Sequence, residues 1–256
     1  MNFLPKEIII IIGLLLPAVA NAVGALPVFF TKSVSQKILD TMLGLAAGIM
    51  LAASCFSLII PSIDYGGGDF KAVMITAVGI IAGAILIDMI DKFAPHEHLL
   101  DKRREGKSSS LSEIWLFIIA ITIHNFPEGL ATGVGFGTNN VYDGLTLSIG
   151  IAIQNMPEGL AVALSLIREQ YSAKKAFLIA SLTGLVEPVG AVLGYYVVHV
   201  FKPILPFILA FAAGCMLFVI CDEIIPETHS NGYERESSYG IIVGFVIMMV
   251  LDILLG

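Results

Sequence analysis

An eight-residue motif occurs twice in this chain, first as His124-Asn125-Phe126-Pro127-Glu128-Gly129-Leu130-Ala131 and 30 residues later as Gln154-Asn155-Met156-Pro157-Glu158-Gly159-Leu160-Ala161. Each copy lies midway along an apolar stretch that is long enough to cross a membrane. Asn, Gln, His and especially Glu are costly to place in hydrocarbon, so ionisable residues at this depth usually mark a functional site. The motif therefore predicts a cation site in the middle of the membrane.

The composition is typical of a polytopic membrane protein. Of the 256 residues, 57% are hydrophobic and only 14% are charged, and the mean hydropathy is +0.89. A soluble domain would carry about 25% charged residues. The net charge of −7 gives no reason to expect nucleic-acid binding. Cys55, Cys215 and Cys221 all lie in apolar stretches, so their expected role is packing and not a disulfide framework.

The apolar stretches predict an all-α polytopic membrane protein with eight transmembrane helices in one transporter domain, residues 1–256. A span needs about 20 mainly apolar residues. The first stretch imitates a signal peptide but continues to Phe30, which is too long, so we interpret it as a retained span. The predicted spans are residues 7–30, 38–60, 71–92, 112–136, 143–167, 174–199, 203–225 and 238–256.

The distribution of Lys and Arg predicts the orientation in the membrane. The loops after spans 1, 3, 5 and 7 carry 11 of the 14 basic residues, and the opposite side carries 3. Cytoplasmic loops are enriched in Lys and Arg. The loop 93–111 is therefore expected to be cytoplasmic, and both termini are expected to be extracytoplasmic.

The repeated motif also predicts internal symmetry. Spans 4 and 5 are consecutive and run in opposite directions, so the motif places similar groups at a similar depth around a pseudo-two-fold axis in the membrane plane. This arrangement is expected of an inverted-repeat transporter core. The alternative is a duplicated kink without a ligand, but a kink alone does not require the glutamates.

Each motif copy places its polar side chains on one side of its helix. Residues four apart share a helix face, and the asparagine between them borders that face. The proline frees the backbone carbonyl four residues earlier, which is tolerated at this depth only beside protein or water. The residues are His124, Asn125 and Glu128 in span 4 and Gln154, Asn155 and Glu158 in span 5.

Two further spans contribute residues of the same kind. Glu187 lies in the middle of span 6, and Met50 lies in the middle of span 2. The spans contain no central Lys or Arg, so a bound cation or protons must compensate three glutamates. A ligand set of imidazole, carboxylates, amides and a thioether suits a first-row divalent metal better than calcium or magnesium.

These motifs resemble those of the ZIP (Zrt/Irt-like) divalent-metal transporters, and most closely their prokaryotic zinc-uptake-permease branch. The resemblance covers nearly the whole chain. It rests on His-Asn-x-Pro-Glu-Gly in span 4, Asn-x-Pro-Glu-Gly in span 5, Glu187 to Ala191 in span 6 and Ala47 to Ser54 in span 2. It implies a 3+2+3 inverted-repeat bundle with the metal site between spans 2, 4, 5 and 6.

The resemblance also implies two adjacent metal positions. The ligands of the first are His124, Glu128, Gln154 and Glu158, with Met50 close by. The ligands of the second are Asn125, Asn155 and Glu187, with Glu128 and Glu158 as bridges. Many relatives have Asp or His in place of Asn155, so the second metal is expected to bind more weakly here.

The function that the resemblance implies is uptake of Zn²⁺ into the cytoplasm across a bacterial or archaeal cytoplasmic membrane. Fe²⁺, Mn²⁺ and Cd²⁺ are expected as competing substrates. No cofactor and no enzymatic activity are expected, and the lipid bilayer and a second copy in a homodimer are the expected partners.

An acidic cluster near the cytoplasmic ends of spans 3 and 7 has two interpretations. The resemblance suggests a metal exit path through Asp91, His96 and Glu223, with Asp222 beside it. The alternative is a solvated helix end. His96 and His98 also allow a cytoplasmic metal sensor, although two histidines in a charged loop are a weak signal.

Two rival functions remain as alternatives. The first is a channel or a carrier of another cation, which kinetics distinguish because a carrier saturates and shows counterflow. The second is an intramembrane aspartyl protease, since Gly66-Gly67-Gly68-Asp69 matches a Gly-x-Gly-Asp signature. A glycine-rich turn explains that segment better. The chain has neither His-Glu-x-x-His nor a Walker A sequence.

Overall fold

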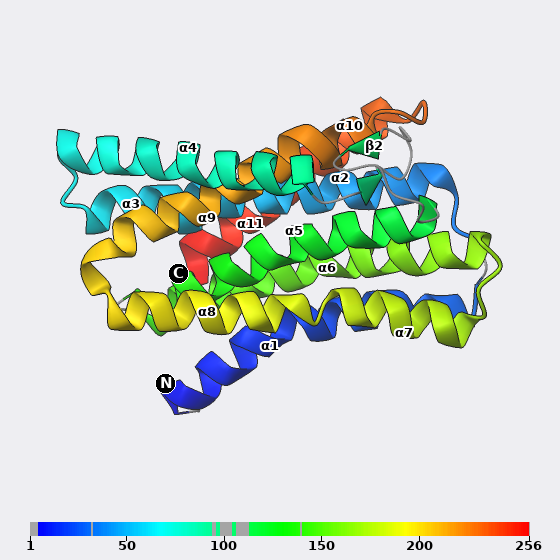
Figure 1. The fold of residues 1–256 in the computed structure, drawn as a ribbon, viewed down its shortest axis with the longest axis horizontal. Helices are drawn as coiled ribbons and strands as arrows, with labels where there is room; N and C mark the ends of the chain where they lie inside the picture. The colour runs from blue at the N-terminus through cyan, green and yellow to red at the C-terminus, as the bar shows by residue number, and fades with distance from the viewer. Residues whose placement is uncertain are drawn as a thin grey trace.

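The computed structural model describes residues 5–31, 33–93, 96–97, 104–105, 113–138 and 140–255. Eight helical segments in this part are long and apolar enough to cross a membrane (Figure 1), which confirms the predicted all-α fold with eight spans. They are numbered spans 1 to 8 and comprise Lys6–Phe29, Gln36–Tyr65, Phe70–Phe93, Ile114–Gly135, Val141–Arg168, Ala173–Val200, Lys202–Thr228 and Glu234–Leu255.

Four of the spans are built from more than one element. Span 1 consists of α1 (Lys6–Ala25) and η1 (Leu26–Phe29), and span 2 consists of α2 (Gln36–Ala53), η2 (Ser54–Ile59) and α3 (Ile60–Tyr65). Span 6 consists of α7 (Ala173–Thr183) and α8 (Val186–Val200). Span 7 consists of η3 (Lys202–Ile204), α9 (Leu205–Val219), η4 (Ile220–Ile224) and α10 (Ile225–Thr228). The others are single helices, α4 (Phe70–Phe93), α5 (Glu113–Gly135), α6 (Val141–Arg168) and α11 (Glu234–Leu255). Between α4 and α5, strands β1 (His96–Glu97) and β2 (Arg104–Glu105) pair antiparallel.

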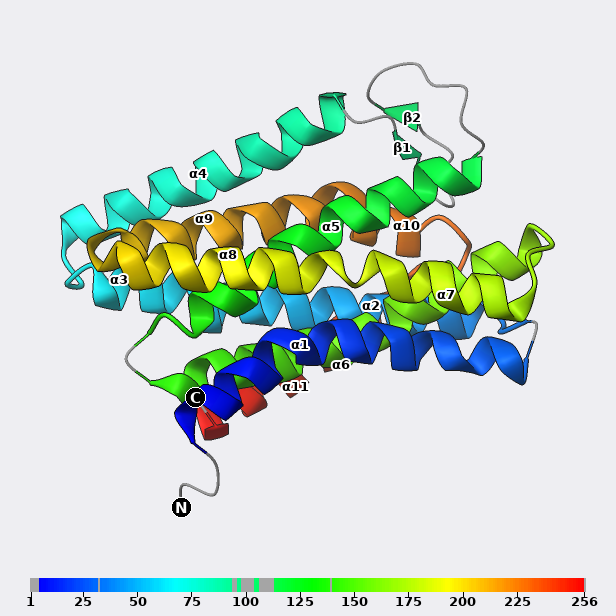
Figure 2. The same ribbon diagram turned by 60° about the horizontal axis from the view of Figure 1, so that its bottom comes forward.

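The spans run back and forth along the long axis of the molecule (Figures 1 and 2). The two chain ends lie on the side where α3 turns into α4 and α8 turns into α9, and the loops after spans 1, 3, 5 and 7 lie at the other end. The basic residues of these loops that the structure describes therefore lie at one end of the bundle. Which end faces the cytoplasm stays a prediction from their charge.

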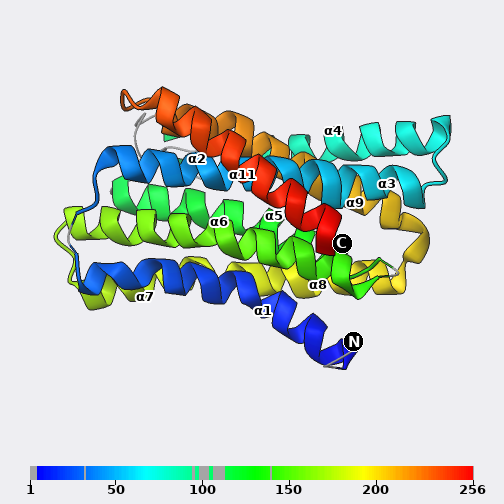
Figure 3. The same ribbon diagram turned by 180° about the vertical axis from the view of Figure 1, so that it is seen from behind.

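The helices pack with the pairing of an inverted repeat. Span 1 packs most extensively on span 5, span 4 on span 6, span 2 on span 8 and span 3 on span 7. In an inverted repeat, spans 1, 2 and 3 correspond to spans 6, 7 and 8, and span 4 corresponds to span 5. The pair of spans 1 and 5 then corresponds to the pair of spans 6 and 4, and the pair of spans 2 and 8 corresponds to the pair of spans 7 and 3. The contacts of span 2 with span 5 and of span 4 with span 7 exchange in the same way. Figure 3 shows α2 and α11 crossing on the opposite face from α5 and α8.

The repeat extends beyond the eight-residue motif into spans 1 and 6. Asn21-Ala22-Val23-Gly24-Ala25 and Glu187-Pro188-Val189-Gly190-Ala191 share Val-Gly-Ala. In both segments the glycine packs against the backbone carbonyl of the third motif residue, which is Met156 for span 1 and Phe126 for span 6. Asn21 therefore occupies the position in the first half of the repeat that Glu187 occupies in the second half.

Spans 2 and 7 form a second matched pair. Both contain Ala-Ala-Gly-x-Met-Leu, beginning at Ala46 and at Ala212, and both then pass through a π-helical turn, η2 or η4. Such turns are uncommon and often lie at functional sites. Seven residues after the methionine, Ser57 stands in span 2 and Glu223 stands in span 7.

Span 6 differs from the single uninterrupted helix that its apolar stretch predicts. The helix stops at Thr183 and resumes at Val186, with Gly184 and Leu185 in a turn between them. The interruption is visible between α7 and α8 in Figure 2. It places Glu187 in the first turn of α8.

Candidate metal-binding site

Every residue assigned to the predicted metal site is buried. The eight side chains come from spans 2, 4, 5 and 6, and none of the residues is more than 8% exposed. They are Met50, His124, Asn125, Glu128, Gln154, Asn155, Glu158 and Glu187. The structure thus places all of them inside the bundle and none on the lipid-facing surface.

The two motif copies contact each other directly. Gln154 Nε2 donates a hydrogen bond to Glu128 Oε1 at 2.6 Å, which joins the amide of one copy to the carboxylate of the other. Pro127 and Pro157 lie inside α5 and α6, which continue as helices on both sides of them. The polar faces of the two antiparallel helices therefore meet, as the inverted repeat predicts.

His124 bonds outside its own motif pair. A hydrogen bond of 2.5 Å joins His124 Nε2 to Glu223 Oε1 in the π-helical turn of span 7. Both residues are buried, and Asp91 of span 3 is close enough to His124 to attract it. Glu223 and Asp91, two of the residues predicted for the exit path, therefore adjoin the predicted central site.

The three central glutamates have more acceptor atoms than partners. Among the described residues, Glu128 Oε2, Glu158 Oε1 and both oxygens of Glu187 are buried without a hydrogen-bond partner. The charged groups that act on these carboxylates in the described part are one another and His124, with no Lys or Arg. Buried carboxylates in this state need a compensating positive charge.

The two motif asparagines add neutral oxygens to the same cluster. Asn155 Nδ2 donates to the carbonyl oxygen of Pro17 in span 1 at 3.3 Å, which fixes the orientation of its amide. The Oδ1 atoms of Asn125 and Asn155 are buried without a hydrogen-bond partner in the described structure. Each asparagine therefore keeps an acceptor oxygen available to a cation.

The side chains are not already arranged around a metal ion. Within the described residues, no three His, Cys, Asp or Glu groups have positions that could hold one. Two hydrogen bonds use atoms that a metal ion would need. Glu128 Oε1 accepts from Gln154, and His124 Nε2 is bonded to Glu223. Metal binding would exchange these contacts for metal–ligand bonds.

The predicted exit residues have different environments. Asp91 and Glu223 are 2% and 3% exposed, which argues against a solvated helix end at these two positions. Asp222 is partly exposed. His96 belongs to β1, but its side chain lies outside the described part of the structure, as does the whole of His98.

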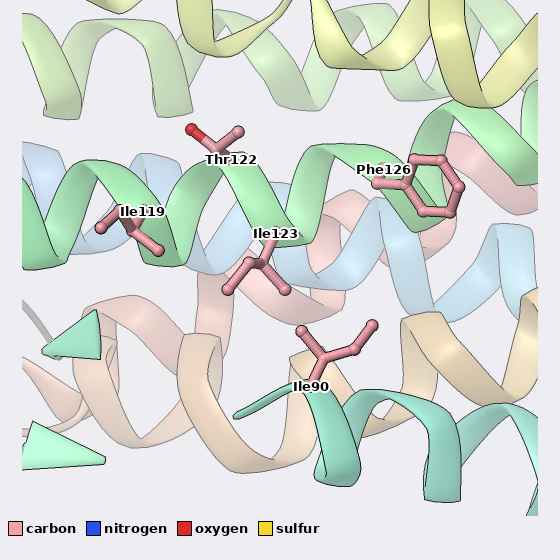
Figure 4. Close-up of a pocket in the computed structure, with 5 residues that line it drawn as sticks. All are labelled: Ile90, Ile119, Thr122, Ile123 and Phe126. Carbon is pink, nitrogen blue, oxygen red and sulfur yellow. The ribbon is translucent and has the colours of Figure 1, made fainter. Parts of the chain in front are cut away.

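The other side of the first motif faces an apolar cavity. This cavity has a volume of about 330 Å³, lies between α4 and α5, and is lined by Ile90, Ile119, Thr122, Ile123 and Phe126. Figure 4 shows Ile90 of α4 and Ile123 of α5 pointing toward each other. The only polar lining group, the Thr122 hydroxyl, donates to the carbonyl oxygen of Ile118 at 2.7 Å. The polar side chains of the first motif, which are predicted to bind metal, thus lie on the opposite face.

Sequence reasoning missed one buried polar residue beside the site. Asn21 of span 1 is 1% exposed, and its Nδ2 donates to the carbonyl oxygen of Ala180 at 2.9 Å. Gly159 of the second motif packs directly against it. The Val-Gly-Ala sequence that spans 1 and 6 share was the signal that could have identified it.

Comparison with known proteins agrees with this geometry. Residues 95–252 match the family model described as ZIP Zinc transporter. The chain is 40% identical over 250 residues to "Zinc transporter GufA" of Myxococcus xanthus, covering 96% of this chain and 98% of that protein. It is 41% identical over 242 residues to "Zinc transporter ZIPB" of Bordetella bronchiseptica, covering 93% and 78%.

A third relative extends the similarity to another named group. "Zinc transporter ZupT" of Chlorobium chlorochromatii is 35% identical over 251 residues, covering 92% of this chain and 93% of that protein. These matches cover both motif copies, the broken span 6 and the π-helical turn of span 7. Together with the family model, they establish that this chain belongs to the ZIP family of zinc transporters.

Proposed function

We propose that this chain is a secondary transporter that moves Zn²⁺ into the cytoplasm through the buried site between spans 2, 4, 5 and 6. One observation carries the proposal. Glu128, Glu158 and Glu187 are buried together with unpartnered oxygens, and in the described structure no Lys or Arg acts on them. A divalent cation supplies the charge that this cluster needs. The names of the relatives support zinc as the cargo.

The mixture of donor atoms supports a transition metal. His124 supplies an aromatic nitrogen and Met50 supplies a thioether, whereas calcium and magnesium sites consist of oxygen ligands. Borderline first-row metals accept nitrogen, oxygen and sulfur together. We therefore propose Fe²⁺ and Mn²⁺ from the first row as competing substrates of the same site, and also Cd²⁺, a softer ion of the same charge.

The ligands support two adjacent metal positions. The first is proposed to use His124, Glu128, Gln154 and Glu158, with Met50 nearby. The second is proposed to use Asn125, Asn155 and Glu187, with Glu128 and Glu158 shared between them. The available oxygens of Glu187 and of the two asparagines support the second position. It is the weaker one, because Asn155 is neutral.

Release into the cytoplasm is proposed to use Glu223 first. This carboxylate already bonds His124, so a metal on His124 can exchange one ligand for another without returning to water. Spans 1, 4, 5 and 6 pack mainly on one another, and so do spans 2, 3, 7 and 8. The three glutamates lie in the first group and Glu223 in the second, so relative motion of the groups gives alternating access. The carboxylates bind cargo, and we propose no enzymatic step.

Zinc uptake into proteoliposomes tests this proposal. Wild-type protein is compared with His124→Ala, with Glu158→Ala, and with Glu169→Ala, a control that removes an exposed carboxylate at the end of the same helix as Glu158. Saturable uptake with counterflow is expected in the wild type and the control, and loss of uptake in the other two variants. Normal uptake by folded Glu158→Ala protein contradicts the site. Unsaturable zinc current contradicts a carrier, and folded wild type that moves no zinc contradicts the cargo.

A further inference from the structure

The interruption of span 6 leaves a backbone carbonyl without a helical partner. In the turn between α7 and α8, the amide of Leu185 bonds the carbonyl oxygen of Leu182, and the amide of Glu187 bonds that of Gly184. The amide of Gly184 bonds the carbonyl oxygen of Leu182 and not that of Ala180, four residues before it. The carbonyl of Ala180 instead accepts hydrogen bonds from two side chains. At membrane depth a freed backbone group of this kind must find a donor within the protein.

Asn21 supplies that donor from a different helix. Its Nδ2 lies 2.9 Å from the carbonyl oxygen of Ala180 and 3.4 Å from the hydroxyl oxygen of Thr183. Thr183 also donates its hydroxyl to the carbonyl of Ala180, at 2.8 Å. All three residues are buried. Span 1 thereby stabilises the end of α7, three residues before α8 begins.

Asn21 also lies against the second motif. A methyl group added at Gly159 would overlap the backbone oxygen of Asn21 and stand 2.6 Å from its Oδ1. A methyl group at Gly184 would stand 2.6 Å from its Nδ2. Gly159 adjoins Glu158, and Gly184 lies three residues before Glu187. One side chain therefore joins the backbones that carry two of the three central glutamates.

The inverted repeat gives the same position a different residue in each half. Glu187 packs against Gly129 of the first motif as Asn21 packs against Gly159 of the second. In the second half of the repeat this residue is Glu187, whose carboxylate belongs to the cluster of three glutamates. In the first half it is Asn21, whose amide donates to the backbone carbonyl of Ala180. The two positions are equivalent in the fold but differ in their contacts.

We propose that Asn21 is a positioning residue for Glu187, which holds the interrupted span 6 at the distance from Glu158 that zinc binding requires. This inference rests on the proposed function, because it assigns Glu187 to the metal site. It predicts that loss of the Asn21 amide weakens zinc binding through Glu187 and leaves the other ligands in place.

The test compares Asn21→Ala with a matched control in zinc-uptake kinetics. The control is Ser148→Ala, which removes a buried hydrogen bond elsewhere on span 1. In that bond, Ser148 Oγ of span 5 donates to the carbonyl oxygen of Gly13 at 2.7 Å. Pro17 frees that carbonyl, so each variant removes one side-chain donor from a backbone carbonyl next to a helix irregularity; the carbonyl of Ala180 keeps the hydroxyl of Thr183. Asn21→Ala is expected to raise the KM for zinc about fivefold, as for one lost hydrogen bond. Ser148→Ala is expected to leave KM unchanged.

Two further measurements separate positioning from general damage. Hydrogen exchange of the amides of residues 184–187 is expected to increase in Asn21→Ala and not in Ser148→Ala. In a Glu187→Gln background, Asn21→Ala is expected to cause no further rise in KM, because the two changes act through one ligand. If Asn21→Ala does not fold, Asn21→Leu, which lacks the donor and is close to asparagine in size, gives the same comparison.

Four results overturn the inference. Asn21→Ala with wild-type KM refutes it directly. An equal rise in KM for Ser148→Ala, or an undiminished rise in the Glu187→Gln background, shows that Asn21 does not act through Glu187. If Glu187→Gln alone leaves KM unchanged, the failure lies in the ligand assignment of the proposed function, and the positioning role fails with it.

Discussion

Replacing Gly129 with alanine should impair zinc uptake by separating the helices that carry Glu128 and Glu187. Gly129 lies in α5 against α8, and an added methyl group would overlap the carbonyl oxygen of Glu187 and stand 2.7 Å from its carbonyl carbon and its Cα. Carbon atoms pack at about 3.5–4.0 Å, so α5 and α8 would have to separate by roughly 1 Å. The contacted atoms belong to the backbone and cannot rotate away.

The expected loss follows from this displacement. Overpacking of this kind costs about 1–3 kcal/mol, which is less than a typical stability of about 5–15 kcal/mol. The protein is therefore expected to fold with a lower melting temperature. A misplacement of about 1 Å in a positioned site lowers activity by up to about 100-fold. We expect the ratio of Vmax to KM for zinc to fall about 10-fold to 100-fold.

Uptake into proteoliposomes and thermal unfolding check this prediction in parallel. Gly150→Ala in α6 is the matched control, because its methyl group would meet the Sδ atom of Met248 and stand 3.1 Å from its Cε, at the end of a flexible side chain. Zinc uptake close to that of the wild type is expected for the control. If folded Gly129→Ala protein transports zinc as well as Gly150→Ala, the reasoning is refuted, because the close approach of α5 and α8 then does not determine the positions of Glu128 and Glu187.

Three further predictions concern the ligands. Asn155→Asp adds a charge at the second metal position, so more zinc should bind per protein, as measured by elemental analysis after dialysis; unchanged stoichiometry and affinity would count against that position. Glu223→Gln weakens the contact with His124 and should slow zinc turnover about tenfold with little change in equilibrium binding, as for one charge-assisted hydrogen bond; wild-type turnover would exclude Glu223 from the path. Lowering the pH should weaken zinc binding, because protons compete for the carboxylates and the imidazole; binding that is independent of pH in equilibrium dialysis would contradict a carboxylate site.

The parts of the fold that sequence predicted are those that depend on local composition. Each span is apolar for long enough that its length and its burial in lipid follow from hydropathy alone. The predicted site residues other than Met50 were chosen because polar groups in such stretches are costly without a function. Their burial within the bundle, on four spans, agrees with that interpretation.

The parts that sequence missed depend on contacts between helices. Pro188 disfavours a continuous helix at Gly184, four residues earlier, but the contact that stabilises the end of α7 comes from Asn21, more than 150 residues earlier. The bond between His124 and Glu223 likewise joins residues 99 positions apart. Hydropathy describes one helix at a time and carries no information on such pairs. The shared Val-Gly-Ala and Ala-Ala-Gly-x-Met-Leu segments carry part of this information, since repeated sequence predicts repeated contacts.

The inverted repeat is symmetric in its backbone and asymmetric in its charge. Asn21 and Ser57, in the first three spans, stand where Glu187 and Glu223 stand in the last three. A carrier with chemically identical halves would have equal free energies when open to either side. At these two positions the acids belong to one half, so we expect the two access states of the proposed carrier to be inequivalent even before a gradient is applied. Two exchanges of a neutral residue for an acid are therefore expected to bias its resting conformation.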